Sequence, residues 1–498
     1  MTTLHHPPTA TPTTPVSAPS TRPASSKNVE RARALGLPSA TALVIGSIIG
    51  TGVFTMPAVM AGAGTSSLLT LGVIAVGALL LAVMFGQLTK RIPSSDGGLY
   101  AYSKHELGDF AGYLTAWCYW ITAWAGNAAI VSSWVLYVES LFSINRPSAW
   151  TNFGIALTGL WIPAAVNLFG ARQMAWLQNV TVVLKFIPLA VVGIVGWVFV
   201  KGANFGPFNA TKGSLYSGIS IAAGVALFSF IGVETASIAA GRVRDPRANV
   251  GRASIYGTLA SGLLYVLVTA AIMGLVAHHT LVNNGAPFVN AFQSMFSGVS
   301  WAGKFVAAVA VISGLGALNG WTLVTAEMPW AAAKDGLFIP QFSWTYRDGV
   351  PWFGILVSTA VASILMAFAY SGKTGLTVFT YLVNLSVVTV AIPYFFSAVA
   401  QLTYLVSGRR AVSGWRLARD LSIAVASSLF SLWVTFAAGY QAVYQALVLF
   451  LIGIPIYAFL KARRESSGLV PPTLDQSGDS DMQEGVIVLA HKEVEVEL

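Results

Sequence analysis

The sequence predicts an all-α polytopic membrane protein, and three observations lead to this class. The chain of 498 residues is 55% hydrophobic and only 9% charged, with a mean hydropathy of +0.69. Charged residues normally make up about a quarter of a soluble protein. Apolar runs of roughly 20 residues recur along the chain, each long enough to cross a hydrocarbon core of about 30 Å. Two of these runs are interrupted by glycines at matching points.

We expect about twelve membrane-spanning helices within a transporter domain of residues 37–464. The expected spans are 38–62, 67–90, 111–139, 149–170, 174–200, 215–240, 251–276, 300–331, 351–370, 377–405, 417–438 and 440–461. Residues 1–36 are rich in Thr, Pro, Ser and Ala and lack the apolar core of a secretory signal. Residues 465–498 are acidic. Both ends are expected to be disordered tails.

The basic residues predict the orientation. With the N-terminus inside the cell, most Lys and Arg residues fall in the inner loops and tails, and the outer loops carry only Arg146, Lys201, Lys212, Lys304 and Lys373. This asymmetry follows the positive-inside rule, so both termini are expected in the cytoplasm and the chain in the plasma membrane. The net charge of +9 therefore reflects topology and does not point to nucleic acid.

The sequence lacks the motifs of disulfide-bonded proteins, metal-binding proteins and several classes of enzyme. The single cysteine, Cys118, excludes an internal disulfide and a cysteine-based metal cluster. The pairs His5-His6 and His278-His279 have no further ligand residues beside them. The chain contains no G-x-S-x-G, H-E-x-x-H or P-loop pattern. We therefore expect no enzyme activity, no metal and no cofactor.

The first interrupted run contains three glycines in seven residues, Gly46-Ser-Ile-Ile-Gly-Thr-Gly52. Glycine destabilises a helix interior and permits unusual backbone angles, so we expect unwound backbone here. Amides at the start of a half-helix suit a carboxylate, and carbonyls at the end of the other half suit an ammonium. The second run, Ser229–Thr235, repeats Ser, Ile and Gly at the same offsets. Paired breaks of this kind indicate a transporter substrate site, here one for a zwitterionic amino acid.

Two ionisable residues lie within the apolar spans. The second break contains Glu234, near the middle of the sixth span, and Lys185 lies near the centre of the fifth span. Charge at membrane depth is costly, so both are functional candidates. Glu234 can take part in coupling or serve as an interhelical hydrogen-bond partner. Lys185 can exchange a proton or act as a fixed positive charge between helices. Glu327 lies nearer the cytoplasm, where it can act as a gate or simply extend its carboxylate to the membrane surface by snorkelling.

Polar and aromatic residues on the third, sixth and eighth spans complete the candidate pocket. Asn127 can contact a substrate or hydrogen-bond to another helix, and Thr122 and Tyr119 lie within two turns of it. Trp321 and Phe228 are at mid-membrane and not at an interface. Their rings can pack in the core or cover a cationic substrate.

Five motifs resemble the amino acid–polyamine–organocation superfamily. They are Gly46–Phe54, Pro93–Tyr102, Ser229–Ser237 followed by Asp245-Pro246-Arg247, Asn319–Leu323 and Ala333–Pro340. Within that superfamily the chain most resembles the basic amino acid/polyamine antiporters, especially arginine/agmatine exchangers. The resemblance implies a five-plus-five inverted repeat, over about residues 38–200 and 215–405, with helices one and six broken and two extra helices within 417–461. It is compatible with a homodimer in the lipid bilayer.

The resemblance also implies site residues and a function. Unwound backbone at Ser47–Gly52 and Phe230–Gly232 would bind the substrate, and Lys185 and Glu234 would couple or gate transport. The full set of substrate-binding candidates is Ser47, Ile48, Gly50, Thr51, Gly52, Tyr119, Thr122, Asn127, Phe228, Ile231 and Trp321. Phe228 departs from the tryptophan of the arginine/agmatine exchangers, and Lys185 matches a fifth-helix lysine of other superfamily members. The expected function is exchange of a cationic amino acid for a related amine or amino acid. The alternatives are a proton-coupled symporter of neutral amino acids and, in another class, a substrate-sensing receptor.

Overall fold

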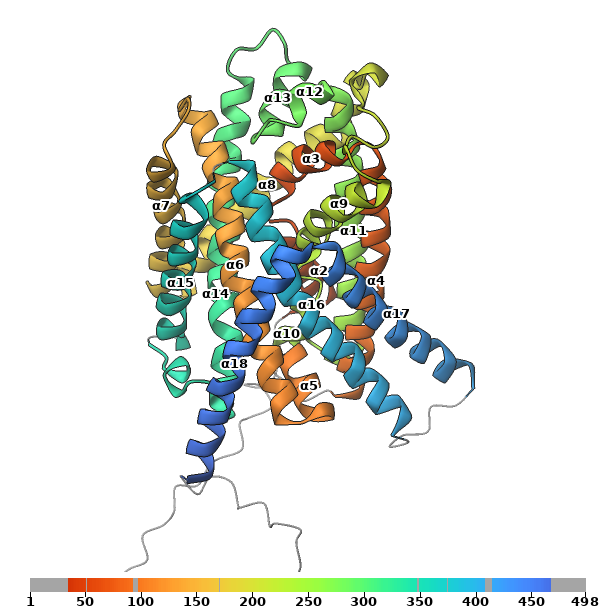
Figure 1. Ribbon diagram of the computed structural model, residues 1–498, viewed down its shortest axis with the longest axis vertical. Coiled ribbons are helices and arrows are strands. Elements are labelled where there is room, and N and C mark those ends of the chain that lie inside the picture. The colour runs from red at the N-terminus through yellow and green to blue at the C-terminus, as the bar shows by residue number, and fades with distance from the viewer. Residues whose placement is uncertain are drawn as a thin grey trace, which may run out of the picture.

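The chain forms a bundle of mostly upright helices (Figure 1). The computed structural model describes residues 35–50, 52–92, 97–169, 171–346, 349–373, 375–407 and 414–466. Within these residues the β-structure is a single parallel bridge between Leu35 and Val243. The prediction of an all-α protein is confirmed.

The first half of the chain contains both broken helices. Its elements are α2 (Leu37–Ile48), α3 (Gly52–Ala63), α4 (Ser66–Arg91), α5 (Leu99–Leu107), α6 (Asp109–Phe142), α7 (Ala149–Leu168), α8 (Ala171–Ala190), η1 (Val191–Val195), η2 (Gly196–Phe199), η3 (Gly202–Asn204), α9 (Leu215–Phe230), α10 (Thr235–Ile238) and η4 (Ala240–Arg242).

The second half contains longer, continuous helices. Its elements are α11 (Pro246–Leu275), α12 (His278–Leu281), α13 (Pro287–Met295), α14 (Ala302–Lys334), η5 (Pro340–Ser343), α15 (Trp352–Tyr370), α16 (Leu376–Val406), α17 (Trp415–Ala437) and α18 (Tyr440–Ser466).

The membrane spans follow the predicted series. Among the described residues, ten helices are long and apolar enough to cross a membrane, or eleven if α2 and α3 count as one broken span. The remaining predicted span, 174–200, corresponds to α8 with η1 and η2, where the winding changes from α to π and then to 3-10. The chain is therefore a polytopic membrane protein, as predicted. The short helices α5, α12 and α13 were not predicted, since they lie in connections without a membrane-length apolar run.

Both predicted breaks are present, but their limits differ from those expected. Gly46, Ser47 and Ile48 remain helical in α2, and the helix resumes at Gly52 with a bend of 50°. In the second break, α9 continues through Phe230, and the unwound stretch is 231–234. Glu234 thus lies inside the second break, as expected. Gly232 adopts a φ of +116°, a conformation that favours glycine.

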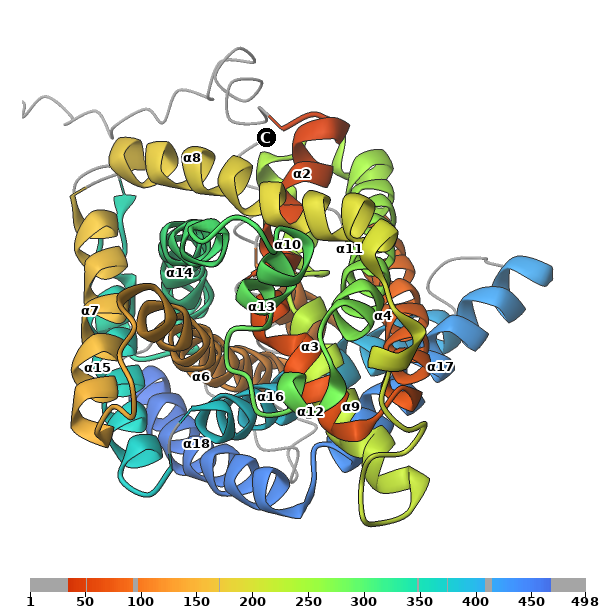
Figure 2. The ribbon, with the colours of Figure 1, turned by 90° about the horizontal axis from the view of Figure 1, so that it is seen from above.

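The helices pack as two groups around the breaks. In one group, α11 packs against α2 and α4, and α9 packs against α3 and α4. In the other, α6 and α14 lie side by side and contact α7 and α15 (Figure 2). Helix α16 packs against α6 and α9, and so contacts both groups. The breaks in α2–α3 and α9–α10 face this boundary.

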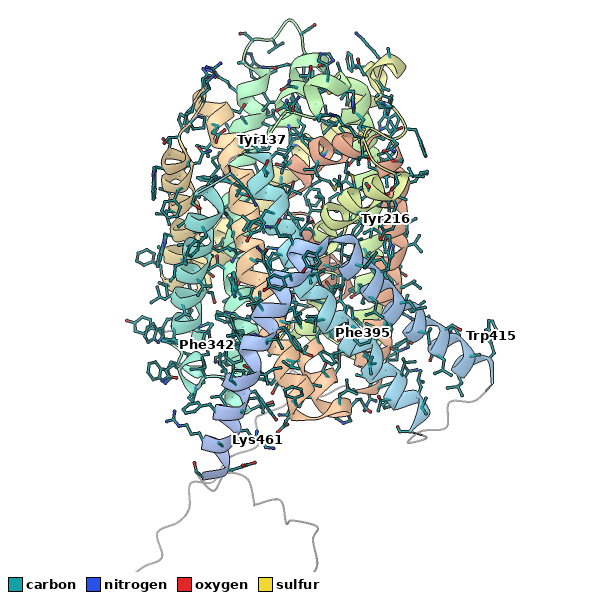
Figure 3. All side chains as sticks on the ribbon, in the orientation of Figure 1. Tyr137, Tyr216, Phe342, Phe395, Trp415 and Lys461 are labelled. Atoms are coloured by element: carbon teal, nitrogen blue, oxygen red, sulfur yellow. The ribbon has the colours of Figure 1, made fainter. Side chains whose placement is uncertain are left out.

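A buried ion pair anchors α17 to the bundle. This helix leans away from the body, and Trp415 lies at its far end (Figures 1 and 3). Asp420 is 4% exposed, lies 2.5 Å from the Arg91 guanidinium and accepts a hydrogen bond from Gln87, both on α4. Arg419 lies 2.8 Å from the same carboxylate. Removing Asp420 would therefore leave the largely buried Arg91 without its acidic partner. Helix α18 descends on the opposite side towards Lys461 (Figure 3).

Candidate functional site

A pocket lies between the two broken helices in the middle of the bundle. Its cavity volume is about 30 Å³, room for one or two water molecules, so the walls lie close together and must separate to admit a larger ligand. Segments from α2, α3, α6, α9, α14 and α16 form its wall, with the two breaks on one side. The lining residues are Ser47, Ile48, Gly50, Gly52, Val53, Thr122, Gly126, Ile130, Phe228, Ser229, Ile231, Trp321 and Ser386.

The two breaks touch each other beside this pocket. A Cβ atom at Gly232 would lie 2.9 Å from the carbonyl carbon of Ser47 and 3.0 Å from the amide nitrogen of Ile48. Tyr265 of α11 joins both breaks, since its hydroxyl lies 2.7 Å from the carbonyl oxygen of Ile48 and 3.1 Å from that of Ser229. The two breaks are therefore in direct contact.

Lys185 hydrogen-bonds to the C-terminal end of α2. Its side chain is 2% exposed, and Nζ donates to the carbonyl oxygens of Gly46, at 2.8 Å, and Ile49, at 2.6 Å. These carbonyls belong to the end of α2 that carries partial negative charge. The amine thus neutralises backbone groups that the break leaves without helical partners.

Glu234 is enclosed by three donors. Oε1 accepts a hydrogen bond from the Tyr119 hydroxyl at 2.7 Å, and Oε2 accepts from the Tyr394 hydroxyl at 2.8 Å and the Gly232 amide at 3.1 Å. The residue is 0% exposed. Because Tyr119 is on α6 and Tyr394 on α16, the carboxyl group connects the second break to two further helices.

The pocket offers backbone polar groups and ring faces. Gly52 and Val53 line it at the first turn of α3, where backbone amides lack helical acceptors and favour an anionic group. Trp321 and Phe228 contribute aromatic surface, which attracts cations. No lining residue that the structure describes carries a charged side chain. A bound cation would therefore rely on carbonyl oxygens and rings.

Most predicted substrate-binding residues line the pocket. They are Ser47, Ile48, Gly50, Gly52, Thr122, Phe228, Ile231 and Trp321. Tyr119 and Asn127 are not among the described lining residues: Tyr119 contacts Glu234, and Nδ2 of Asn127 donates to Thr325 Oγ1 at 3.1 Å. Thr51 lies outside the described residues.

Other residues of the site were not predicted. Gly126, Ile130 and Ser386 line the pocket from α6 and α16, and Tyr265 and Tyr394 hydrogen-bond to its breaks. Gly126 directly precedes Asn127, a predicted substrate-binding residue, so its position in the sequence could have indicated that it lines the pocket. The sequence did not single out Ser386, because a serine hydroxyl in an apolar span also hydrogen-bonds to its own helix. It did not single out Tyr265 and Tyr394, because a tyrosine ring in an apolar span is equally compatible with packing.

Polar contacts join the elements at the end of the bundle beyond α10. Arg242 of η4 lies 3.1 Å from Glu327 of α14, and the Leu35 backbone pairs with Arg242 and Arg244. Asp335 accepts hydrogen bonds from Lys104 and Tyr100. Partial burial alone would raise the pKa of Asp335, but these two donors hold that pKa below its ordinary value. The contacts link η4, α5 and the end of α14 on this side of the pocket.

A pocket between two broken helices of a polytopic bundle defines the class of membrane transporters. The chain belongs to the amino acid permease family, whose model matches residues 35–460. It is 29% identical over 431 residues to the putrescine transporter PotE of Haemophilus influenzae, covering 86% of this chain and 97% of that one. It is 30% identical over 450 residues to an arginine/ornithine antiporter of Pseudomonas aeruginosa, covering 88% and 92%. It is also 28% identical over 376 residues to the cadaverine/lysine antiporter of Escherichia coli, covering 74% and 83%.

Proposed function

We propose that this protein is an antiporter that exchanges a cationic amino acid for a related amine or amino acid across the plasma membrane. The observation that carries the proposal is the pocket between the two breaks, where the amides of Gly52 and Val53 begin α3 beside aromatic rings. The relatives named for arginine/ornithine, lysine/cadaverine and putrescine transport support this substrate class. They favour exchange over proton-coupled symport of neutral amino acids.

In this proposal the backbone binds the α-carbon end of the substrate. The carboxylate accepts hydrogen bonds from the start of α3, because these amides lack helical acceptors. The α-ammonium group binds carbonyl oxygens near Ile231, at the end of α9. The carbonyls of Gly46 and Ile49 are less available, since Lys185 already donates to both.

The cationic side chain of the substrate extends between Phe228 and Trp321. Both rings line the pocket, which carries no acidic side chain in the described wall. A cation over a desolvated ring gains about 2 kcal/mol, and a guanidinium or an ammonium can use the same surface. Arginine, lysine and their amine relatives are therefore compatible with one pocket.

Transport follows from relative movement of the two helix groups. The breaks in α2–α3 and α9–α10 lie at their boundary and touch at Gly232. Glu234 connects the second break to α6 and α16, so we assign it a coupling or gating role, and Lys185 stabilises the first break. Opening below the pocket requires the Arg242–Glu327 pair to separate. The basic residues support a cytoplasmic location for this end.

Exchange is tested in proteoliposomes that contain the purified full-length chain. The vesicles are preloaded with arginine, ornithine, lysine, putrescine, cadaverine or no substrate, and uptake of labelled arginine is followed. Exchange predicts strong uptake only into vesicles preloaded with a cationic substrate. Equal uptake into empty vesicles, driven by a proton gradient, would instead favour symport. Binding without flux would favour a receptor.

A pair of glycine variants controls for the pocket. A Cβ at Gly126 would lie 3.4 Å from Ser386 Oγ and 3.8 Å from the Phe228 ring, so Gly126→Leu places its side chain in the pocket. A Cβ at the exposed Gly154 on α7 meets no atom within 4 Å. We expect Gly126→Leu to abolish exchange and Gly154→Leu to retain it.

A further inference from the structure

A second and larger groove lies at the end of the bundle opposite α5. Elements η2 and η3 form one side, and the end of α11 with α12 and α13 forms the other. Its volume is about 700 Å³, and it shares no described lining residue with the substrate pocket. Figure 1 places α12 and α13 at the top of the molecule, above the broken helices.

One positive charge lies in this groove among neutral hydrogen-bonding groups. Lys201 is the only charged residue among the described lining residues, which also include Asn290, Gln293 and Thr280. The backbone around Lys201 is fixed, because its amide donates to the Gly274 carbonyl at 2.9 Å. A cation beside several amides and hydroxyls suits an anionic group with many acceptor oxygens, such as a phosphate.

The groove continues onto an apolar surface. Val198 and Phe199 belong to its lining and are 80% and 40% exposed. Ile194 and Trp197, on the same stretch, are 74% and 43% exposed. Exposed apolar residues at the end of a membrane helix contact lipid, and tryptophan is frequent at the headgroup level. An occupant that satisfies both surfaces is amphiphilic.

We propose that this groove binds an anionic phospholipid, with Lys201 paired to the headgroup phosphate and an acyl chain along residues 194–199. A free amino acid would satisfy the polar wall and leave the apolar surface unused. On the orientation that the basic residues predict, the lipid belongs to the outer leaflet. The site is independent of exchange through the substrate pocket, since the two sets of lining residues do not overlap.

The test is a lipid titration of the purified full-length chain by native mass spectrometry, with phosphatidylglycerol and phosphatidylcholine. Wild type should bind one phosphatidylglycerol more tightly than phosphatidylcholine. Lys201→Gln should weaken the tightest phosphatidylglycerol site about five-fold, the effect of one lysine near an anionic lipid. Gln293→Glu, which adds a negative charge to the exposed wall, should also weaken it. Lys212→Gln, at an exposed lysine outside the groove, should match wild type.

Several outcomes would overturn the proposal. One is phosphatidylglycerol affinity that is the same in wild type, Lys201→Gln and Gln293→Glu. Another is equal affinity of wild type for the two lipids. Displacement of the lipid by millimolar glycerol phosphate or inorganic phosphate would show an anion site without lipid recognition. Competition between the lipid and arginine that Lys201→Gln removes would assign the groove to substrate. Tryptophan fluorescence melting of each variant confirms that the comparison is between folded proteins.

Discussion

Replacing Lys185 by methionine tests how the first break is stabilised. The variant keeps an unbranched side chain of similar length and removes the ammonium that donates to Gly46 and Ile49 at 2.8 and 2.6 Å. Each hydrogen bond from a charged group contributes about 1.5–3 kcal/mol, so two contribute about 3–6 kcal/mol. Burial of the ammonium costs several kcal/mol and no longer opposes folding in the variant. The net value for the two hydrogen bonds already contains the penalty of about 1–3 kcal/mol for each carbonyl left without this donor.

The balance predicts a net loss of about 3 kcal/mol for the closed form of the α2 end. That loss corresponds to roughly a hundredfold rise in the population in which this end is open. Amide hydrogen exchange reports such local opening. We therefore expect peptides that cover α2 and α3 to exchange roughly a hundredfold faster in Lys185→Met, in nanodiscs. Peptides from α7 and α15, which do not contact Lys185, should be unchanged.

The control is Lys304→Met, at an exposed lysine in the first turn of α14, which should exchange like wild type. Unchanged protection of α2 and α3 in Lys185→Met would refute this account of the break.

The position of the Lys185 ammonium also predicts that transport does not depend on sodium. An ammonium already beside the carbonyls of α2 would repel a second cation there, so wild-type transport should be equal in sodium and choline buffers. A strict sodium requirement would contradict this role of Lys185.

Four further changes test the other parts of the site. Trp321→Leu removes a ring from the pocket lining and should weaken arginine binding about five- to thirtyfold without lowering the melting temperature; normal binding would mean that the ring only packs. Gly232→Ala places a Cβ 2.9 Å from Ser47 on a residue with a φ of +116°, and it should destabilise the fold by about 1–3 kcal/mol or more. The control is Gly46→Ala, whose added Cβ would have no atom within 4 Å; its melting temperature should equal or exceed that of wild type. Glu234→Gln should still bind substrate but exchange it more slowly and lose the wild-type pH profile between about pH 5 and pH 8, and a variant with the wild-type rate and profile would make Glu234 purely structural. The pKa of Asp335 is lowered, so its contacts stabilise the fold above the unfolded pKa of about 4, and this contribution is lost as the pH falls through the folded pKa. The melting temperature of wild type should therefore fall more steeply with acid than that of Asp335→Asn. Parallel curves would contradict the role of Lys104 and Tyr100.

Local patterns in the sequence were sufficient for the class of protein and for both breaks. The length of each apolar run depends only on the residues within it, and membrane helices satisfy their own backbone hydrogen bonds. Glycine acts at the position where it stands, so Gly50 and Gly232 marked the breaks directly. The limits of the breaks were less predictable. Gly46 remains helical in α2, which packs against Gly257 of α11 at the neighbouring Val44 and Ile45.

The site was predicted best where it is built from backbone. Gly50, Gly52 and Ile231 line the pocket because a break necessarily exposes the backbone around it. Asn127 was placed less well, since its helix, α6, is buried along its length and the direction of its amide depends on the facing helix. Thr325 of α14 faces it and accepts its hydrogen bond.

By itself, the sequence determined that this chain is a helical membrane protein with two paired breaks, and that Lys185 and Glu234 lie at membrane depth. These properties follow from hydropathy, glycine and charge, which act over one helix or less. Only the tertiary structure decided that Lys185 donates to the carbonyls of α2 and that Tyr119 and Tyr394 donate to Glu234. Those partners are more than one hundred residues apart in the chain. They meet because α6, α8 and α16 pack around the breaks, and packing depends on the shapes of all the side chains at those interfaces together.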